Sequence, residues 1–206
     1  MIKQYTTVLI DMYGVILNES KGRLLAYSKD NFDETQYKTV ENMIWNDRLF
    51  DKAGLGQISS DEFLKMLGFD DTEYHMKRYL EDYLTLDRGF IKFAETVKDK
   101  YDIVLLSNDV SEWSKYITEY HGLNKYFKDK IVSADVKCRK PDLKIFDLTL
   151  EHIKKSPAEC IFIDNNVQNL LSAEEVGISP ILFNRDNEHF EGLTVYSFDE
   201  LIDYLA

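Results

Sequence analysis

The sequence predicts an α/β protein in which a doubly wound parallel sheet forms the core and a small helical domain forms a cap. Short apolar runs rich in Val, Ile and Leu end in polar residues, which is typical of strands buried on both faces of a parallel sheet. Segments with apolar residues at helical spacing alternate with these runs. One long stretch, residues 17–86, has helical spacing and no strand-like run. We therefore expect residues 1–16 and 87–206 to form the core and residues 17–86 to form the cap.

The first element is the motif VLIDMYG at residues 8–14, whose apolar part predicts a buried strand ending at Asp11. Apolar residues then recur at helical spacing through the cap, with one clear break at residues 53–59. Glycines in this break end one helix, and Ser59 with Glu62 forms a capping box that begins the next.

Strands and helices alternate after the cap. Strands are predicted at residues 103–106, 130–133, 160–164 and 180–183, and helices at residues 90–100, 111–122, 141–153, 170–177 and 201–206. Pro141 suits the first turn of its helix, because the backbone donor that proline lacks would be unpaired there anyway.

Polar residues follow three of the predicted strands. They are Asp11, Ser107 with Asn108, and Asp164 with Asn165. Ligands of parallel sheets bind outside the carboxyl ends of the strands, so we expect these side chains to meet at one phosphate-sized site. Lys140, in the segment RKP at residues 139–141, supplies a cation.

The order of four motifs resembles that of the haloacid dehalogenase-like hydrolase superfamily. The motifs are VLIDMYG at residues 8–14, IVLLSN at 103–108, RKP at 139–141 and CIFIDNN at 160–166. Within the superfamily they look most like the small-cap subgroup that contains sugar-phosphate phosphatases, the phosphatase domain of epoxide hydrolases, and dehalogenases. The resemblance implies a Rossmann-like core and a phosphatase that acts on a small phosphorylated metabolite.

The resemblance also implies a role for each motif. Asp11 would be the nucleophile, Tyr13 would stand where the general acid and base belongs, and Lys140 would be the catalytic cation. Ser107 and Asn108 would bind the substrate phosphate. The cofactor would be Mg2+, held by Asp11, the main-chain carbonyl of Tyr13, Asp164 and Asn165.

Elementary chemistry calls for the same residue types. A carboxylate can form an aspartyl-phosphate, which splits one difficult displacement into two easier ones. Two anions must then approach each other, so a Lys and an oxygen-bound Mg2+ lower the Coulomb energy. A hydroxyl and an amide, here Ser107 and Asn108, can donate hydrogen bonds to phosphate oxygens without adding charge.

Two residues depart from the family pattern. Tyr13 replaces an Asp that protonates the leaving oxygen and later activates water, and a phenol is a poor base at neutral pH. Asn165 replaces a second acid, so the metal would face formal negative charges from Asp11 and Asp164 alone. We expect low activity and weakened metal binding.

Two alternatives stay open at this point. Dehalogenases of the superfamily also carry Asp-x-Tyr-Gly and work without metal, so a metal-independent 2-haloacid dehalogenase-like enzyme is one alternative. A charged Asp164 beside Asp11 argues against it, because the pair would repel a carboxylate substrate unless a cation lay between them. The other alternative is a catalytically impaired pseudo-enzyme that binds a phosphorylated ligand or a protein.

Composition narrows the expected partners and location. The formal net charge of −12 and the pI near 4.8 argue against nucleic acid and anionic membranes, because both require a basic surface. Two cysteines, Cys138 and Cys160, make a disulfide framework improbable. The sequence has no apolar leader and no apolar run of about 18 residues. We therefore expect a cytoplasmic protein, and the sequence does not specify its oligomeric state.

Overall fold

A single six-stranded parallel sheet forms the core of the computed structural model, which describes residues 5–205. Its strands are β1 (Thr7–Ile10), β2 (Asp102–Ser107), β3 (Asp129–Val132), β4 (Cys160–Asp164), β5 (Ser179–Phe183) and β6 (Leu193–Val195). The spatial order is β3-β2-β1-β4-β5-β6, with every neighbouring pair parallel. This order confirms the predicted doubly wound fold. The strand order reverses between β1 and β4, so a ligand is expected at the carboxyl ends of these two strands.

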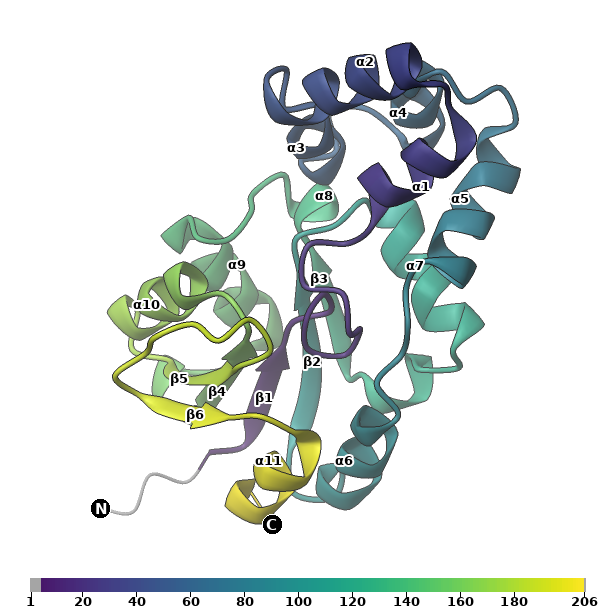
Figure 1. Ribbon diagram of the computed structural model, residues 1–206. Helices are drawn as coiled ribbons and strands as arrows, with labels where there is room; N and C mark the ends of the chain where they lie inside the picture. The colour runs from purple at the N-terminus through teal and green to yellow at the C-terminus, as the bar shows by residue number, and fades with distance from the viewer. Residues whose placement is uncertain (1–4, 206) are drawn as a thin grey trace.

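Helices cover both faces of the sheet (Figure 1). On one face lie α9 (Leu143–Ile153) and α10 (Val167–Glu175), and on the other lie α6 (Gly89–Val97), α7 (Ser111–Tyr120) and α11 (Phe198–Leu205). Alternate residues of each strand point to opposite faces. Leu9 therefore packs in the core under α9 and α10, whereas Val8 and Ile10 pack in the core under the other helices. Because both faces of the sheet are buried, these strands appear in the sequence as unbroken apolar runs.

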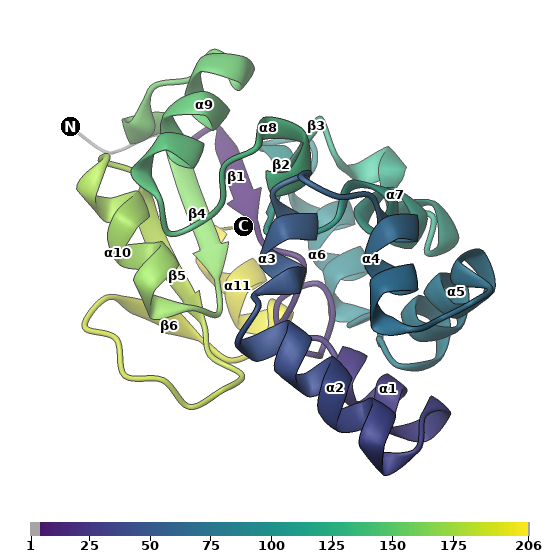
Figure 2. The same cartoon turned by 90° about the horizontal axis from the view of Figure 1, so that it is seen from above.

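Five helices lie beyond the carboxyl ends of the strands (Figures 1 and 2). They are α1 (Leu24–Asn31), α2 (Glu34–Trp45), α3 (Leu49–Gly54), α4 (Ser60–Leu67) and α5 (Thr72–Asp82). The predicted capping box is present at the start of α4, where Ser59 and Glu62 each accept the other's backbone donor. These helices are not a separate body, because Phe63 and Tyr79 pack their rings against Trp113 of α7.

Several details of the predicted elements were wrong or incomplete. The helices predicted from residues 170 and 201 begin three residues earlier, at Val167 and Phe198. Pro141 lies before α9 instead of in its first turn, because the Asp142 side chain caps the helix and Leu143 is its first residue. The short helix α8 (Ser133–Val136) and the short edge strand β6 were not predicted. Both are too short to show a hydrophobic period. Within residues 5–205, no helix is both long enough and apolar enough to cross a membrane.

Candidate active site

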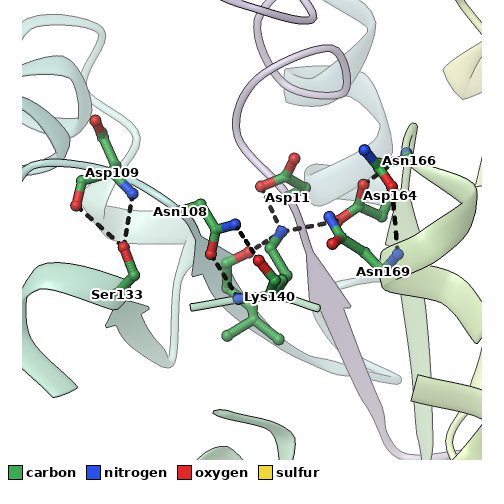
Figure 3. Close-up of polar contacts among 9 residues, drawn as sticks. Asp11, Asn108, Asp109, Ser133, Lys140, Asp164, Asn166 and Asn169 are labelled. Atoms are coloured by element: carbon green, nitrogen blue, oxygen red, sulfur yellow. Dashed lines mark hydrogen bonds and ion pairs between the residues drawn. The ribbon is translucent and has the colours of Figure 1, made fainter. Parts of the chain in front are cut away.

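The polar ends of β1 and β4 meet at the ammonium group of Lys140 (Figure 3). The Lys140 Nζ lies 2.8 Å from Asp11 Oδ1 and 2.7 Å from Asp164 Oδ2. All three side chains are withdrawn from solvent, with exposed fractions of 7% for Asp11, 2% for Lys140 and 0% for Asp164. Residues far apart in the sequence therefore form one buried carboxylate–ammonium–carboxylate group.

Residues at the end of β2 hold Lys140 in place. Its Nζ also donates to the Leu106 carbonyl at 2.8 Å. The Asn108 side chain forms two hydrogen bonds with the Lys140 main chain. Its Nδ2 donates to the Lys140 carbonyl at 2.8 Å, and its Oδ1 accepts from the Lys140 amide at 2.9 Å. Asn108 thus orients the lysine, and both of its polar atoms are occupied in doing so.

Burial and charge shift the pKa values in this group. Burial raises the pKa of Asp11 to about 7, against the opposing effect of Lys140 and with a further increase from Asp164. Burial alone would lower the pKa of Lys140, but the carboxylates of Asp11 and Asp164 outweigh it and raise that pKa above its ordinary value. The lysine is therefore a permanent cation in the floor of the site.

Asp164 uses both of its oxygens inside the protein. Besides Lys140, its Oδ2 accepts from Asn169 Nδ2 at 3.0 Å, and its Oδ1 accepts from the Asn166 amide at 2.8 Å. Asn166 also caps α10 through its side chain, as expected for a structural turn residue. Asp164 is therefore placed to fix the lysine, with little capacity left for another ligand.

Tyr13, two residues after Asp11, contacts a second buried acid, Asp109. The Tyr13 hydroxyl donates to Asp109 Oδ1 at 3.2 Å, and the Val110 amide donates to the same oxygen at 2.8 Å. Burial raises the pKa of Asp109 to about 8. Burial, with the negative charge of Asp109 next in importance, raises the pKa of Tyr13 well above its ordinary value.

The remaining predicted site residues are Ser107 and Asn165. Ser107 is fully buried at the end of β2, and its hydroxyl has no hydrogen-bond partner among residues 5–205. Asn165 follows Asp164 and lies against Gly14, where an added Cβ would collide with the Asn165 amide. Gly14 has a φ of +78°, so both space and backbone conformation require glycine at that position.

Six of the predicted site residues form the floor of a pocket of about 700 Å³: Asp11, Tyr13, Asn108, Lys140, Asp164 and Asn165. Ser107 lies below this floor and does not line the pocket. The opposite wall comes from the helices beyond the sheet and carries Arg23, Ile44, Trp45, Arg48 and Phe50. At its rim, Asp51 of α3 pairs with both Arg48 and Arg139, the residue before Lys140. The pocket therefore has a polar floor and a wall that is partly apolar and partly cationic.

Some residues around this site were not predicted from the sequence. They are Asp109, Asn169, Arg185 and Asp186. Arg185 and Asp186 follow the end of β5, so the rule that selected Asp11 and Asp164 could have selected them as well. Asn169 lies within α10, away from any strand end, so the same rule does not select it.

The oxygen atoms near Asp11 fit a hard cation such as Mg2+. Within the described part of the chain, no three His, Cys, Asp or Glu side chains converge as metal ligands. A cation would therefore need other oxygens beside the Asp11 carboxylate, and the Tyr13 carbonyl and the Asn165 amide are of the required type. Asn165 donates its Nδ2 to Asp186, which leaves its Oδ1 for a cation.

Comparisons with known proteins point to one family. The family model for haloacid dehalogenase-like hydrolases matches residues 5–177. The HAD-hydrolase YfnB of Bacillus subtilis is 26% identical over 208 residues, covering 90% of this chain and 86% of YfnB. D-ribitol-5-phosphate phosphatase of Bacteroides thetaiotaomicron is 26% identical over 140 residues, covering 63% of this chain and 68% of the phosphatase.

Solved structures share the fold. The HAD family enzyme bt-2542 of Bacteroides thetaiotaomicron, in complex with magnesium and inorganic phosphate, superimposes with a TM-score of 0.75 at 24% identity, covering 91% of this chain and 98% of that one. A dehalogenase superimposes with a TM-score of 0.72 at 21% identity, covering 100% of this chain and 99% of the other. The same fold therefore occurs in an enzyme crystallised with magnesium and phosphate and in a dehalogenase, so the fold alone does not identify the reaction.

Proposed function

The chain belongs to the haloacid dehalogenase-like hydrolase family, and we propose that it is a Mg2+-dependent phosphatase that hydrolyses a small phosphomonoester through Asp11. The observation that carries the proposal is the pair of contacts from Lys140 to Asp11 and Asp164, at 2.8 and 2.7 Å, in the pocket floor. A buried cation beside a carboxylate nucleophile lowers the cost of bringing an anionic phosphate to it.

The proposed reaction has two displacements. An Asp11 oxygen attacks phosphorus, the ester bond breaks, and the leaving oxygen takes the proton of the Tyr13 hydroxyl. Water then attacks the aspartyl-phosphate, gives a proton to the Tyr13 phenolate, and releases inorganic phosphate and the Asp11 carboxylate. The raised pKa of Tyr13 makes it a weak acid, so we expect slow turnover.

In this proposal Mg2+ neutralises the phosphate oxygens when it is bound. Asp11, the Tyr13 carbonyl and Asn165 would hold it, and Asp164 would act through Lys140. Ser107 would donate its hydroxyl to the phosphate, whereas Asn108 would contribute by orienting Lys140. The helices in residues 17–86 would serve as a cap that covers the substrate. Two observations support this choice of substrate class and cofactor: one relative is a D-ribitol-5-phosphate phosphatase, and bt-2542 was crystallised with magnesium and inorganic phosphate.

The buried charge beside Asp11 favours the phosphatase over the dehalogenase alternative. Asp164 is fully buried beside Asp11, and Lys140 balances only part of the charge of the two carboxylates. A carboxylate substrate would enter against the remaining negative charge. A phosphate substrate that arrives with Mg2+ does not meet this barrier.

The experiment is hydrolysis of p-nitrophenyl phosphate by the purified protein with MgCl2. We expect Asp11→Asn to lower the rate by about 10^3-fold or more, and EDTA to abolish it reversibly. The control is Asp147→Asn, which changes an exposed acid of α9. Turnover of 2-chloropropionate that survives EDTA would overturn the proposal in favour of a dehalogenase.

A second variant tests the pseudo-enzyme alternative. Tyr13→Asp restores the carboxylate that the family usually has at this position. If the natural protein is inert on a panel of phosphate metabolites and Tyr13→Asp is active, the chain is a binding protein instead of an enzyme. Turnover of any metabolite by the natural protein excludes that alternative.

A further inference from the structure

We propose that Asp186 is a positioning residue for the cation site, where it orients Asn165 and supplies the carboxylate charge that the motif after β4 lacks. The inference rests on the proposed Mg2+-dependent function. Asp186 belongs to the loop after β5, outside the four motifs of the sequence analysis. Its two carboxylate oxygens both contact residues of the pocket.

The contacts of Asp186 join three distant segments. Its Oδ2 accepts from Asn165 Nδ2 at 2.9 Å, and its Oδ1 accepts from the Ser20 hydroxyl at 2.9 Å. All three residues line the same pocket as Asp11. An amide has one donor end and one acceptor end, so a carboxylate that takes the donor end leaves the oxygen of Asn165 as the end for a cation.

The loop that carries Asp186 is held to the nucleophile segment. The Arg185 Nε donates to the Gly14 carbonyl at 3.0 Å, and an Nη2 donor of Arg185 reaches the Val15 carbonyl at 3.1 Å. Behind it, buried Asn184 closes the loop by hydrogen bonds to the main chain of Glu188 at 3.0 and 2.9 Å. Asp186 is therefore an anchored side chain, although it is exposed to solvent.

The charges around Asp11 explain why another acid is needed. Lys140 pairs with both Asp11 and Asp164, so the buried group carries a net charge of only one negative unit when both carboxylates are ionised. Asn165 adds oxygen but no charge. Asp186 places a second negative charge beside Asn165, where it favours a divalent cation. Groups that orient a metal ligand in this way typically change metal affinity by about 10-fold to 100-fold.

The test is isothermal titration calorimetry with MgCl2 at constant ionic strength, on protein freed of metal. We expect Asp186→Asn to weaken Mg2+ binding by about 10-fold to 100-fold. The matched control is Glu191→Gln, which removes one charge from the same loop at an exposed side chain that does not line the pocket. Its Mg2+ affinity should stay within about 2-fold of the natural protein, because long-range charge effects are screened.

A charge-swapped variant, Asn165→Asp with Asp186→Asn, keeps one Asp–Asn pair and one negative charge. We expect it to bind Mg2+ at least as tightly as the natural protein, and it serves as the test if Asp186→Asn does not fold. Natural-like Mg2+ affinity of Asp186→Asn, or loss of binding in the swapped variant, would overturn the role of Asp186 while leaving a Mg2+-dependent phosphatase intact. Absence of Mg2+ binding by the natural protein would instead overturn the proposed cofactor and this inference together.

Discussion

The floor and the wall of the pocket are built in opposite ways. In the floor, Lys140 is 2% exposed and Asp164 is 0% exposed, and both have several polar partners inside the protein. In the wall, Trp45 is 63% exposed and the Arg48 side chain is 74% exposed. The floor is therefore part of the folded core, whereas the wall presents exposed side chains to the pocket. This division is typical of sites where a rigid scaffold carries the chemistry and peripheral segments carry the specificity.

Among the substitutions that test this difference between floor and wall, removal of the floor's cation should have the largest effect on stability. Lys140→Met leaves Asp11 and Asp164 buried side by side without a counter-charge, so we expect the free energy of unfolding to fall by about 3 to 5 kcal/mol. Urea denaturation measures this change. Lys144→Met, at an exposed lysine of α9, is the control and should change stability by less than about 0.5 kcal/mol. A loss below about 1 kcal/mol for Lys140→Met would show that the floor is not part of the stabilising core.

A smaller effect should come from Asp109, the buried acid behind Tyr13. The pKa of Asp109 is about 8 in the folded protein and 3.8 as its ordinary value, so between these values the folded state holds a proton that the unfolded state has lost. The free energy of unfolding of the metal-free protein should therefore fall as the pH rises through this window. In Asp109→Asn this dependence should be shallower, as measured by urea denaturation at about pH 5 and about pH 8. Equal pH dependence in the two proteins would contradict the assignment.

The smallest effect on stability should come from the wall. Trp45→Ala should change the free energy of unfolding by less than about 0.5 kcal/mol, because the side chain is mostly exposed. If Trp45 contacts the substrate equally in the ground and transition states, KM for p-nitrophenyl phosphate should rise by up to about 10-fold with kcat unchanged. Met66→Ala, at another exposed apolar residue that does not line the pocket, is the control. A fall in kcat without a change in KM would mean that the wall takes part in the chemical step.

The difference between a buried core and its surroundings also explains which strands and site residues could be predicted from the sequence. Five of the six strands were predicted because burial on both faces gives each an unbroken apolar run, as in Ile103–Leu106 within β2. Asp11 and Asp164 were selected because a strand end is visible in the sequence. Asn169 was not assigned its contact with Asp164, because helix geometry, rather than the strand pattern, brings its amide to that carboxylate.

Two facts about the site depend on packing between distant segments. Asn108 was predicted to bind phosphate, but the structure occupies both of its polar atoms with the main chain of Lys140, 32 residues away. Asp186 lies 21 residues from Asn165 and 166 residues from Ser20, so no local pattern connects the three. Such partnerships exist only after the sheet has assembled.

The sequence by itself determined the order of the five longer strands, the positions of the four motifs and the opposite charges of Asp11 and Lys140, because these features are encoded by periodicity and residue type within short windows. Only the tertiary structure decided which oxygen faces which donor, which acids become buried enough to hold a proton, and which residue stands beside Asn165. The physical reason is that desolvation and hydrogen bonding depend on the atoms that surround a group, and most of those atoms come from segments remote in the chain.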